Sequence, residues 1–150
     1  MPRYAAFLRG VNLGRNRRVS SAELTSCFER SGFECVQTFR TSGNVVFDAG
    51  RQSPGRLTAT IEDALAKSLG YDVSVFLRTA QEVRAIAEHR PFPAKSVKAS
   101  EGKLQVSMLG AEPSAAAREQ TLALATDDDR LRSKSGSSTG FRAAAYATQP

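Results

Sequence analysis

The chain has 150 residues, of which 41% are hydrophobic and 24% are charged, and its formal net charge is +6. These values are typical of a globular protein with one domain, or with two small halves that share a core. No apolar run approaches the roughly 20 residues that a membrane helix needs, and Arg9 interrupts the first apolar run. We therefore expect neither a membrane span nor a signal peptide, and a cytoplasmic location is the default expectation.

The basic charge is concentrated at the N-terminus. Residues 1–22 contain no acidic residue and five arginines: Arg3, Arg9, Arg15, Arg17 and Arg18. Three of these lie within four positions, so their mutual repulsion needs relief by solvent or by an anion. The stretch could hold phosphate or a nucleic-acid backbone, or it could be a solvated loop.

The N-terminal part of the chain predicts alternating strands and helices. Residues 4–8 are typical of a strand, and Ser20 and Glu23 have the spacing of a capping box, so a helix should begin there and end near Gly32. Residues 35–47 read as a β-hairpin that turns at Thr41-Ser-Gly-Asn44.

A second helix and a fourth strand complete this part. Ser53 and Pro54 predict a helix start, Gly70 predicts its end, and residues 73–77 predict a strand. The order β-α-β-β-α-β is the split βαβ pattern of ferredoxin-like folds, which place both helices on one face of an antiparallel sheet. The expected fold class is thus α+β, with residues 1–78 as the first ferredoxin-like half.

Residues 79–132 predict a second, incomplete α/β half. Thr79 and Glu82 form another capping box, and the helix that follows should end before Pro91. We expect a loop over 94–102, a strand over 103–109 and an alanine-rich helix to about residue 124.

Three stretches resemble a known family in their order and spacing: YAAFLRGVNLGRNRRVSSAEL (4–24), FECVQTFRTSGNVVF (33–47) and VFLRTAQEVRAIAEHRPFP (75–93). The family is the bacterial domain-of-unknown-function 1697 family, and the resemblance covers about residues 3–132. It implies two intertwined ferredoxin-like halves. The family carries no assigned activity, so the resemblance leaves function open.

The C-terminus departs from the family pattern. The family continues into a strand, a Pro-Gly-Gly turn and a helix, whereas residues 133–150 show no amphipathic period and no acidic residue. One explanation is a disordered basic tail. The other is a shift of reading frame near Arg132, because a shifted frame can encode a family-like strand and turn.

The loop after the first strand is the first candidate site. Gly10, Asn12, Gly14 and Asn16 tolerate positive φ and expose backbone N–H groups ahead of a helix, which suits an anion. The nearby arginines would add charge-assisted hydrogen bonds. The pattern is neither a Walker A loop nor a GxGxxG fingerprint, and the glycines could instead only shape a tight connection.

Thr41, Ser42 and Asn44 form the second candidate. We expect the hairpin turn to lie at the opposite end of a split βαβ sheet from the first loop, so that 9–16 and 41–44 need not share a pocket. The alternative is a plain turn whose side chains bond to the backbone.

The sequence gives only weak signals for catalysis, metal binding or thiol chemistry. His89, the only histidine, is placed to cap a helix rather than to act as a base. Asp127–Asp129 could attract a divalent cation, but three consecutive acids are more typical of a solvated turn. Cys27 and Cys35 lack CxxC spacing and are expected to be reduced packing thiols. Neither a metal nor a cofactor is expected.

Aromatic strand residues offer one further possibility. Phe7, Phe39 and Phe47 would resemble RNA-stacking residues only if they face solvent. Core packing is the expected role.

The sequence thus supports three functional hypotheses. The first is a non-enzymatic module that binds a phosphate-bearing ligand or nucleic acid through residues 9–18. The others are an enzyme acting on a small phosphorylated or acidic substrate, oriented by Arg9 and Asn12, and a protein-interaction domain. The candidate ligand-binding residues are Arg9, Gly10, Asn12, Gly14, Arg15, Asn16, Arg17, Arg18, Ser42 and Asn44.

Overall fold

The computed structural model describes residues 1–13, 17–39, 43–101, 104–126, 129–133 and 143–148. The chain divides into two compact units, Met1–Val83 and Arg84–Pro150. Each unit has its own sheet, of four strands in the first and three in the second. In the described residues, no helix is long and apolar enough to cross a membrane.

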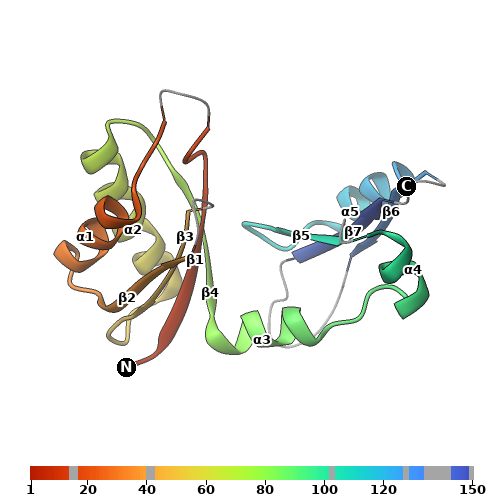
Figure 1. Cartoon of the computed structure of the whole chain (residues 1–150), viewed down its shortest axis with the longest axis horizontal. Coiled ribbons are helices and arrows are strands. Elements are labelled where there is room, and N and C mark those ends of the chain that lie inside the picture. The colour runs from red at the N-terminus through yellow and green to blue at the C-terminus, as the bar shows by residue number, and fades with distance from the viewer. Residues whose placement is uncertain (14–16, 40–42, 102–103, 127–128, 134–142, 149–150) are drawn as a thin grey trace. The chain divides into compact units, whose positions relative to one another are not determined.

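The first unit is an antiparallel sheet with two helices. Its elements are β1 (Arg3–Arg9), α1 (Ser21–Arg30), β2 (Glu34–Phe39), β3 (Asn44–Asp48), α2 (Pro54–Leu69) and β4 (Ser74–Thr79). The strand order is β2-β3-β1-β4, and every neighbouring pair is antiparallel. Both helices cover the same face of the sheet (Figure 1). The predicted α+β class and the predicted order of elements are confirmed.

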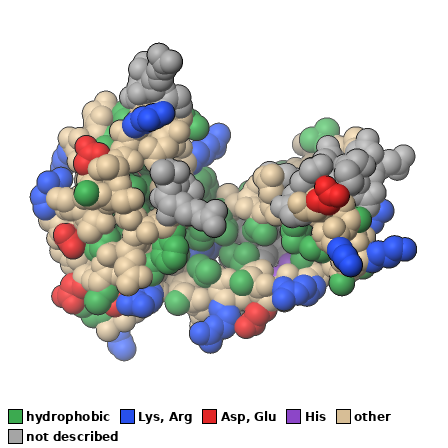
Figure 2. Space-filling model, in the orientation of Figure 1, with side chains coloured by type: hydrophobic (Ala, Val, Ile, Leu, Met, Phe, Trp, Pro, Cys, Tyr) green, Lys and Arg blue, Asp and Glu red, His purple; other side chains and the backbone are tan. Residues whose placement is uncertain are grey.

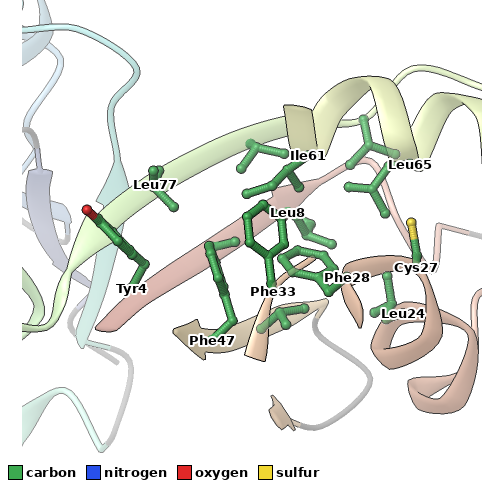
Figure 3. Close-up of a cluster of buried hydrophobic side chains, with 14 of the residues drawn as sticks. Tyr4, Leu8, Leu24, Cys27, Phe28, Phe33, Phe47, Ile61, Leu65 and Leu77 are labelled. Atoms are coloured by element: carbon green, nitrogen blue, oxygen red, sulfur yellow. The ribbon is translucent and has the colours of Figure 1, made fainter. Parts of the chain in front are cut away.

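The core of this unit forms between the helices and one face of the sheet. Alternate residues of β1 are buried there, namely Tyr4, Ala6 and Leu8, because successive side chains of a strand point to opposite faces. Phe47 lies at the centre of an aromatic group: its ring centroid is 5.2 Å from that of Phe28 and 4.7 Å from that of Phe33 (Figure 3). These rings and the aliphatic side chains of α1 and α2 form one continuous cluster.

Both helices begin and end as predicted. The Ser20 side chain accepts a hydrogen bond from the Glu23 N–H, and the Glu23 carboxylate accepts one from the Ser20 N–H, which completes the capping box of α1. Ser53 caps α2, and Gly70 ends it at φ +76°, a left-handed conformation that glycine adopts at low cost.

The structure corrects the expected placement of the hairpin turn. Strand β3 lies between β1 and β2 and is antiparallel to both, and Phe7, near the end of β1, is paired with Asn44, the first residue of β3. The turn into β3 therefore lies at the same end of the sheet as the loop that leaves β1. The prediction of opposite ends was wrong.

The close packing of these two segments is visible at Gly43. This residue is buried at φ +78°, and a Cβ atom added to it would overlap the side chain of Val11. The turn and the loop after β1 are therefore packed against each other.

The side chains of Cys27 and Cys35 have different environments. Cys27 is buried on α1, as expected for a packing thiol, and both cysteines are free. Cys35, however, is exposed and adopts φ +49° where the register of β2 against β3 shifts between Glu34 and Gln37. This bulge takes Cys35 out of the regular alternation.

The boundary between the units falls within α3 (Ala80–Glu88), whose start is capped by Thr79 and Glu82 as predicted. Beyond α3, the second unit comprises α4 (Ala94–Ala99), β5 (Leu104–Met108), α5 (Ala115–Ala123), β6 (Asp129–Ser133) and β7 (Ala143–Thr148), with the sheet order β5-β7-β6. Its described core is small, with Phe92 packed by Val97 and Leu104.

Two parts of this unit differ from the sequence-based expectations. Residues 94–99 form α4 rather than a loop. Pro93 stands directly before the helix, and Val97 has an apolar partner in Phe92. Strand β7 lies within the segment for which a tail was expected, and it pairs with β5 and β6. Most residues of β7 are small and uncharged, which is compatible with a neighbouring strand on each side.

Replacing Phe47 with alanine tests the position of the core. Phe47→Ala should lower the free energy of unfolding by about 3–5 kcal/mol, because it removes a fully buried ring and leaves a cavity. Phe39→Ala is the matched control, since Phe39 is 52% exposed, and it should change stability by about 0.5 kcal/mol or less. Urea unfolding of both variants measures the difference, and equal decreases in stability would contradict this assignment of the core.

Gly43 tests the packing of the turn against the loop. Gly43→Ala should destabilise the protein by roughly 2–4 kcal/mol, since it combines a left-handed backbone with steric overlap at Val11. Gly50→Ala is the control, because a Cβ there meets no atom within 4 Å. Thermal unfolding should separate the two variants, and similar midpoints would argue against close packing on Val11.

Candidate functional site

The loop between β1 and α1 is closed by its own backbone. Asn12 adopts φ +54°, its N–H donates to the Arg17 carbonyl over 2.6 Å, and Leu13 and Arg17 form an antiparallel bridge. The segment therefore turns back on itself in a narrow loop. Gly14, Arg15 and Asn16 lie outside the described residues.

The Asn12 side chain holds the end of this loop against the start of α1. Its Oδ1 atom accepts a hydrogen bond from the Val19 N–H over 2.9 Å, and Val19 is buried in the core. The amide oxygen therefore has a structural role, which explains why a short polar side chain stands at this left-handed position.

Arg17 is held by Tyr71, a residue that the sequence analysis did not single out. The Tyr71 hydroxyl donates to the Arg17 carbonyl over 3.4 Å, and the Arg17 guanidinium lies 4.9 Å from the centre of the Tyr71 ring. This is a cation–π arrangement. The sequence offers no signal for the pair, because Tyr71 follows α2 and lies 54 positions further along the chain.

The described candidate residues gather at one end of the first unit. A Cβ atom added to Gly10 would lie 3.8 Å from the Nη1 atom of Arg17, so the guanidinium passes beside this glycine. Gly43 packs on Val11, and Asn44 is paired with Phe7 next to the loop. Of the second candidate, Thr41 and Ser42 lie outside the described residues.

The arginines at this end have no acidic partner within the described part of the chain. Arg9, Arg17 and Arg18 are exposed, and no ion pair joins them to an acidic group of the described residues. Arg3 is different, because its Nε and Nη2 atoms donate to the two carboxylate oxygens of Asp48 over 2.8 and 3.0 Å. Figure 2 shows basic side chains at the upper end of the first unit.

The Arg3–Asp48 pair also affects ionisation. The hydrogen bond from Arg3 holds the pKa of Asp48 below its usual value and raises the pKa of Arg3. The N-terminal basic charge is thus neutralised at one end of β1 and left without a described acidic partner at the other.

A surface cavity lies elsewhere on this unit. It has a volume of about 290 Å³, and its lining residues come from α1 and α2: Cys27, Arg30, Ser31, Ala64, Lys67 and Ser68. None of the candidate binding residues contributes to it. Burial raises the pKa of the Cys27 thiol, which makes the thiolate scarce and Cys27 a poor nucleophile.

Catalytic and metal-binding groups are sparse in the described part of the chain. His89 follows the last residue of α3, and its N–H bonds to the Ile86 carbonyl, while Arg90 donates to the Ala87 carbonyl over 2.7 Å. In the residues that the structure describes, no group of three or more His, Cys, Asp or Glu side chains could hold a metal ion. Asp127 and Asp128 are not among them.

Comparison with solved structures identifies a similar fold. The conserved bacterial protein SP0830 from Streptococcus pneumoniae superposes with a TM-score of 0.73, covering 100% of this chain and 78% of its own. The two sequences are 24% identical, so the likeness shows the fold alone. No curated protein sequence matches this chain.

The family is shown by the sequence itself. The pattern of the family described as "Protein of unknown function (DUF1697)" matches residues 1–137, which includes the first unit and most of the described second unit. The predicted resemblance is therefore confirmed, and the chain belongs to the DUF1697 family.

Proposed function

We propose that this protein is a non-enzymatic module that binds a phosphate-bearing ligand, nucleic acid included, through residues 9–18. The observation that carries the proposal is the group of exposed guanidinium groups on Arg9, Arg17 and Arg18, which form no ion pair with a described acidic group. Guanidinium groups form strong charge-assisted hydrogen bonds with phosphate oxygens.

The closed loop supports this proposal. Arg17 is restrained through its carbonyl, which accepts from the Asn12 N–H and the Tyr71 hydroxyl, and through its guanidinium, which lies over the Tyr71 ring. A restrained side chain loses less conformational freedom when a ligand binds. The loop therefore presents positive charge from a backbone that is already ordered on both sides of its tip.

The proposed site includes residues that the structure does not describe. Arg15 adds a further positive charge to the sequence of this stretch, and Ser42 directly precedes Gly43, which packs beside Val11. The full proposed set is Arg9, Gly10, Asn12, Gly14, Arg15, Asn16, Arg17, Arg18, Ser42 and Asn44. Within it, the Asn12 amide oxygen supports the loop, and the arginines contact the ligand.

An enzyme acting on a small phosphorylated or acidic substrate is the second candidate. It is favoured by one observation: the loop after β1 and the turn before β3 lie at the same end of the sheet. This arrangement could bring Arg9, Asn12 and Asn44 to one substrate. The surface cavity described above, however, is lined by residues of α1 and α2 rather than by these three.

We also propose a more specific fold within the observed α+β class. We infer that residues 1–78 form a ferredoxin-like half, and the antiparallel strand order β2-β3-β1-β4 supports this. Residues 79–132 would be the second, intertwined and incomplete half.

Removing two arginines of the loop tests the binding proposal. Arg17→Ala with Arg18→Ala should weaken binding of a labelled single-stranded oligonucleotide at low salt. It should also reduce the slope of log K against log salt by roughly 0.7 for each phosphate that the protein no longer neutralises. Fluorescence anisotropy over a salt series measures both quantities.

The control removes the same charge elsewhere in the first unit. Arg51→Ala with Arg56→Ala lowers the net charge by two as well, and both residues are exposed. This variant should retain the wild-type salt slope. Equal weakening in the two double variants would show that only net charge matters and would dispose of a site at the loop.

A further inference from the structure

Three segments of the chain meet at the end of the sheet where the proposed binding loop lies. The loop leaves β1, the turn before β3 packs on it at Val11, and the connection from α2 enters β4 here, because Arg9 is paired with Ser74. This third connection contains Tyr71, which directly follows Gly70, the residue that ends α2. The fold therefore brings Tyr71 to the loop although the two are distant in the sequence.

Arg17 lies against Tyr71 and beside the backbone of Gly10. Its guanidinium carbon is 4.9 Å from the centre of the Tyr71 ring, and its Nη1 atom is 3.8 Å from the place where a Cβ atom of Gly10 would stand. The Tyr71 hydroxyl also donates a hydrogen bond to the Arg17 carbonyl over 3.4 Å. Tyr71 therefore contacts both the side chain and the backbone of Arg17.

The Tyr71 side chain is itself supported by the fold. It is partly buried and packs against the hydrophobic core of the first unit. An arginine on a loop, in contrast, loses rotamer freedom when it binds a ligand, and ordering such a side chain lowers affinity by roughly 2- to 10-fold. Because Tyr71 holds Arg17 before a ligand arrives, it reduces this loss.

The geometry of a guanidinium group makes this contact compatible with anion binding. Its five N–H donors lie in the plane of the group, whereas an aromatic ring attracts a cation to the face of the ring. A guanidinium held over a ring can therefore still donate two parallel hydrogen bonds to phosphate oxygens. Arg17 is exposed and forms no ion pair with an acidic group in the described part of the chain.

We propose that Tyr71 is a positioning residue of the phosphate-binding site and holds the Arg17 guanidinium where its N–H edge meets a phosphate group. The inference rests on the proposed function and adds to the site a residue from a third segment of the chain. Within the described residues, neither Arg9 nor Arg18 lies over an aromatic ring. The contribution of Arg17 to binding therefore depends on Tyr71, and that of Arg18 does not.

A double-mutant cycle tests this role. Tyr71→Leu keeps an apolar side chain beside the core and should weaken binding of a labelled single-stranded oligonucleotide by about 2- to 10-fold. The effect should disappear in an Arg17→Ala background and persist in the matched Arg18→Ala background. The salt slope of Tyr71→Leu should stay at its wild-type value, because no charge is lost. Tyr71→Phe retains the ring and should bind nearly as the wild type does.

Two further measurements do not depend on the stability of Tyr71→Leu, and urea unfolding verifies that each variant is folded. Arg17→Lys leaves Tyr71 intact and preserves the charge, but it replaces the planar fork with a compact ammonium group, so it should also weaken binding. In the protein without ligand, the ring current of Tyr71 should shift the NMR signals of the Arg17 side-chain protons upfield. Tyr71→Phe should retain this shift and Tyr71→Leu should lose it.

The outcomes separate this inference from the proposed function. Equal weakening by Tyr71→Leu with and without Arg17 would overturn the inference, and so would wild-type affinity in Arg17→Lys or the absence of the NMR shift. If Tyr71→Leu binds normally while the double variant of Arg17 and Arg18 binds weakly, the loop binds phosphate without Tyr71, and only the inference is overturned. If the wild type does not bind the oligonucleotide at low salt, the same cycle is measured with inorganic phosphate. Absence of binding there as well would overturn the proposed function and the inference together.

Discussion

The antiparallel pairing of β1 with β3 is the constraint on which the candidate site depends. Pairing Phe7 with Asn44 fixes where β1 ends relative to the start of β3, and thereby brings two polar segments to one end of the sheet. The same register places Leu8 and Val45 in the core and Phe7 on the other face. A shift by one residue would exchange these faces, so the core and the position of the loop are determined together.

Much of the first unit follows from local signals in the sequence. The capping residues Ser20 and Ser53 and the terminal Gly70 act through short-range hydrogen bonds and backbone preferences, so they mark helix boundaries reliably. The family motifs agree with the observed order of elements. The placement of the hairpin turn was wrong for a topological reason. The short hairpin makes β3 antiparallel to β2, and β3 also pairs antiparallel with β1, so the start of β3 lies beside the end of β1.

The contacts that shape the site were less predictable because they join distant positions. Tyr71 holds Arg17, and Gly43 packs on Val11, yet neither pair has a sequence spacing that signals contact. The exposure of Phe39 was also not predictable from the sequence. Its alternating strand pattern is compatible with either face, and only the register with β3 decides that the ring is exposed. Similarly, α4 was missed because six residues give too short a period to recognise.

The structure separates the groups that hold the loop from the groups that carry its charge. The loop is closed by the Asn12 N–H and amide oxygen and by the Arg17 carbonyl, all of them uncharged. Val11 and Val19 anchor both of its ends in the core. The guanidinium groups of Arg9 and Arg18 have no described role in these contacts, and that of Arg17 contributes only its stack on Tyr71. Charge at this end of the sheet adds repulsion without adding to the closure of the loop. The anionic ligand proposed for the loop would relieve this repulsion through charge-assisted hydrogen bonds.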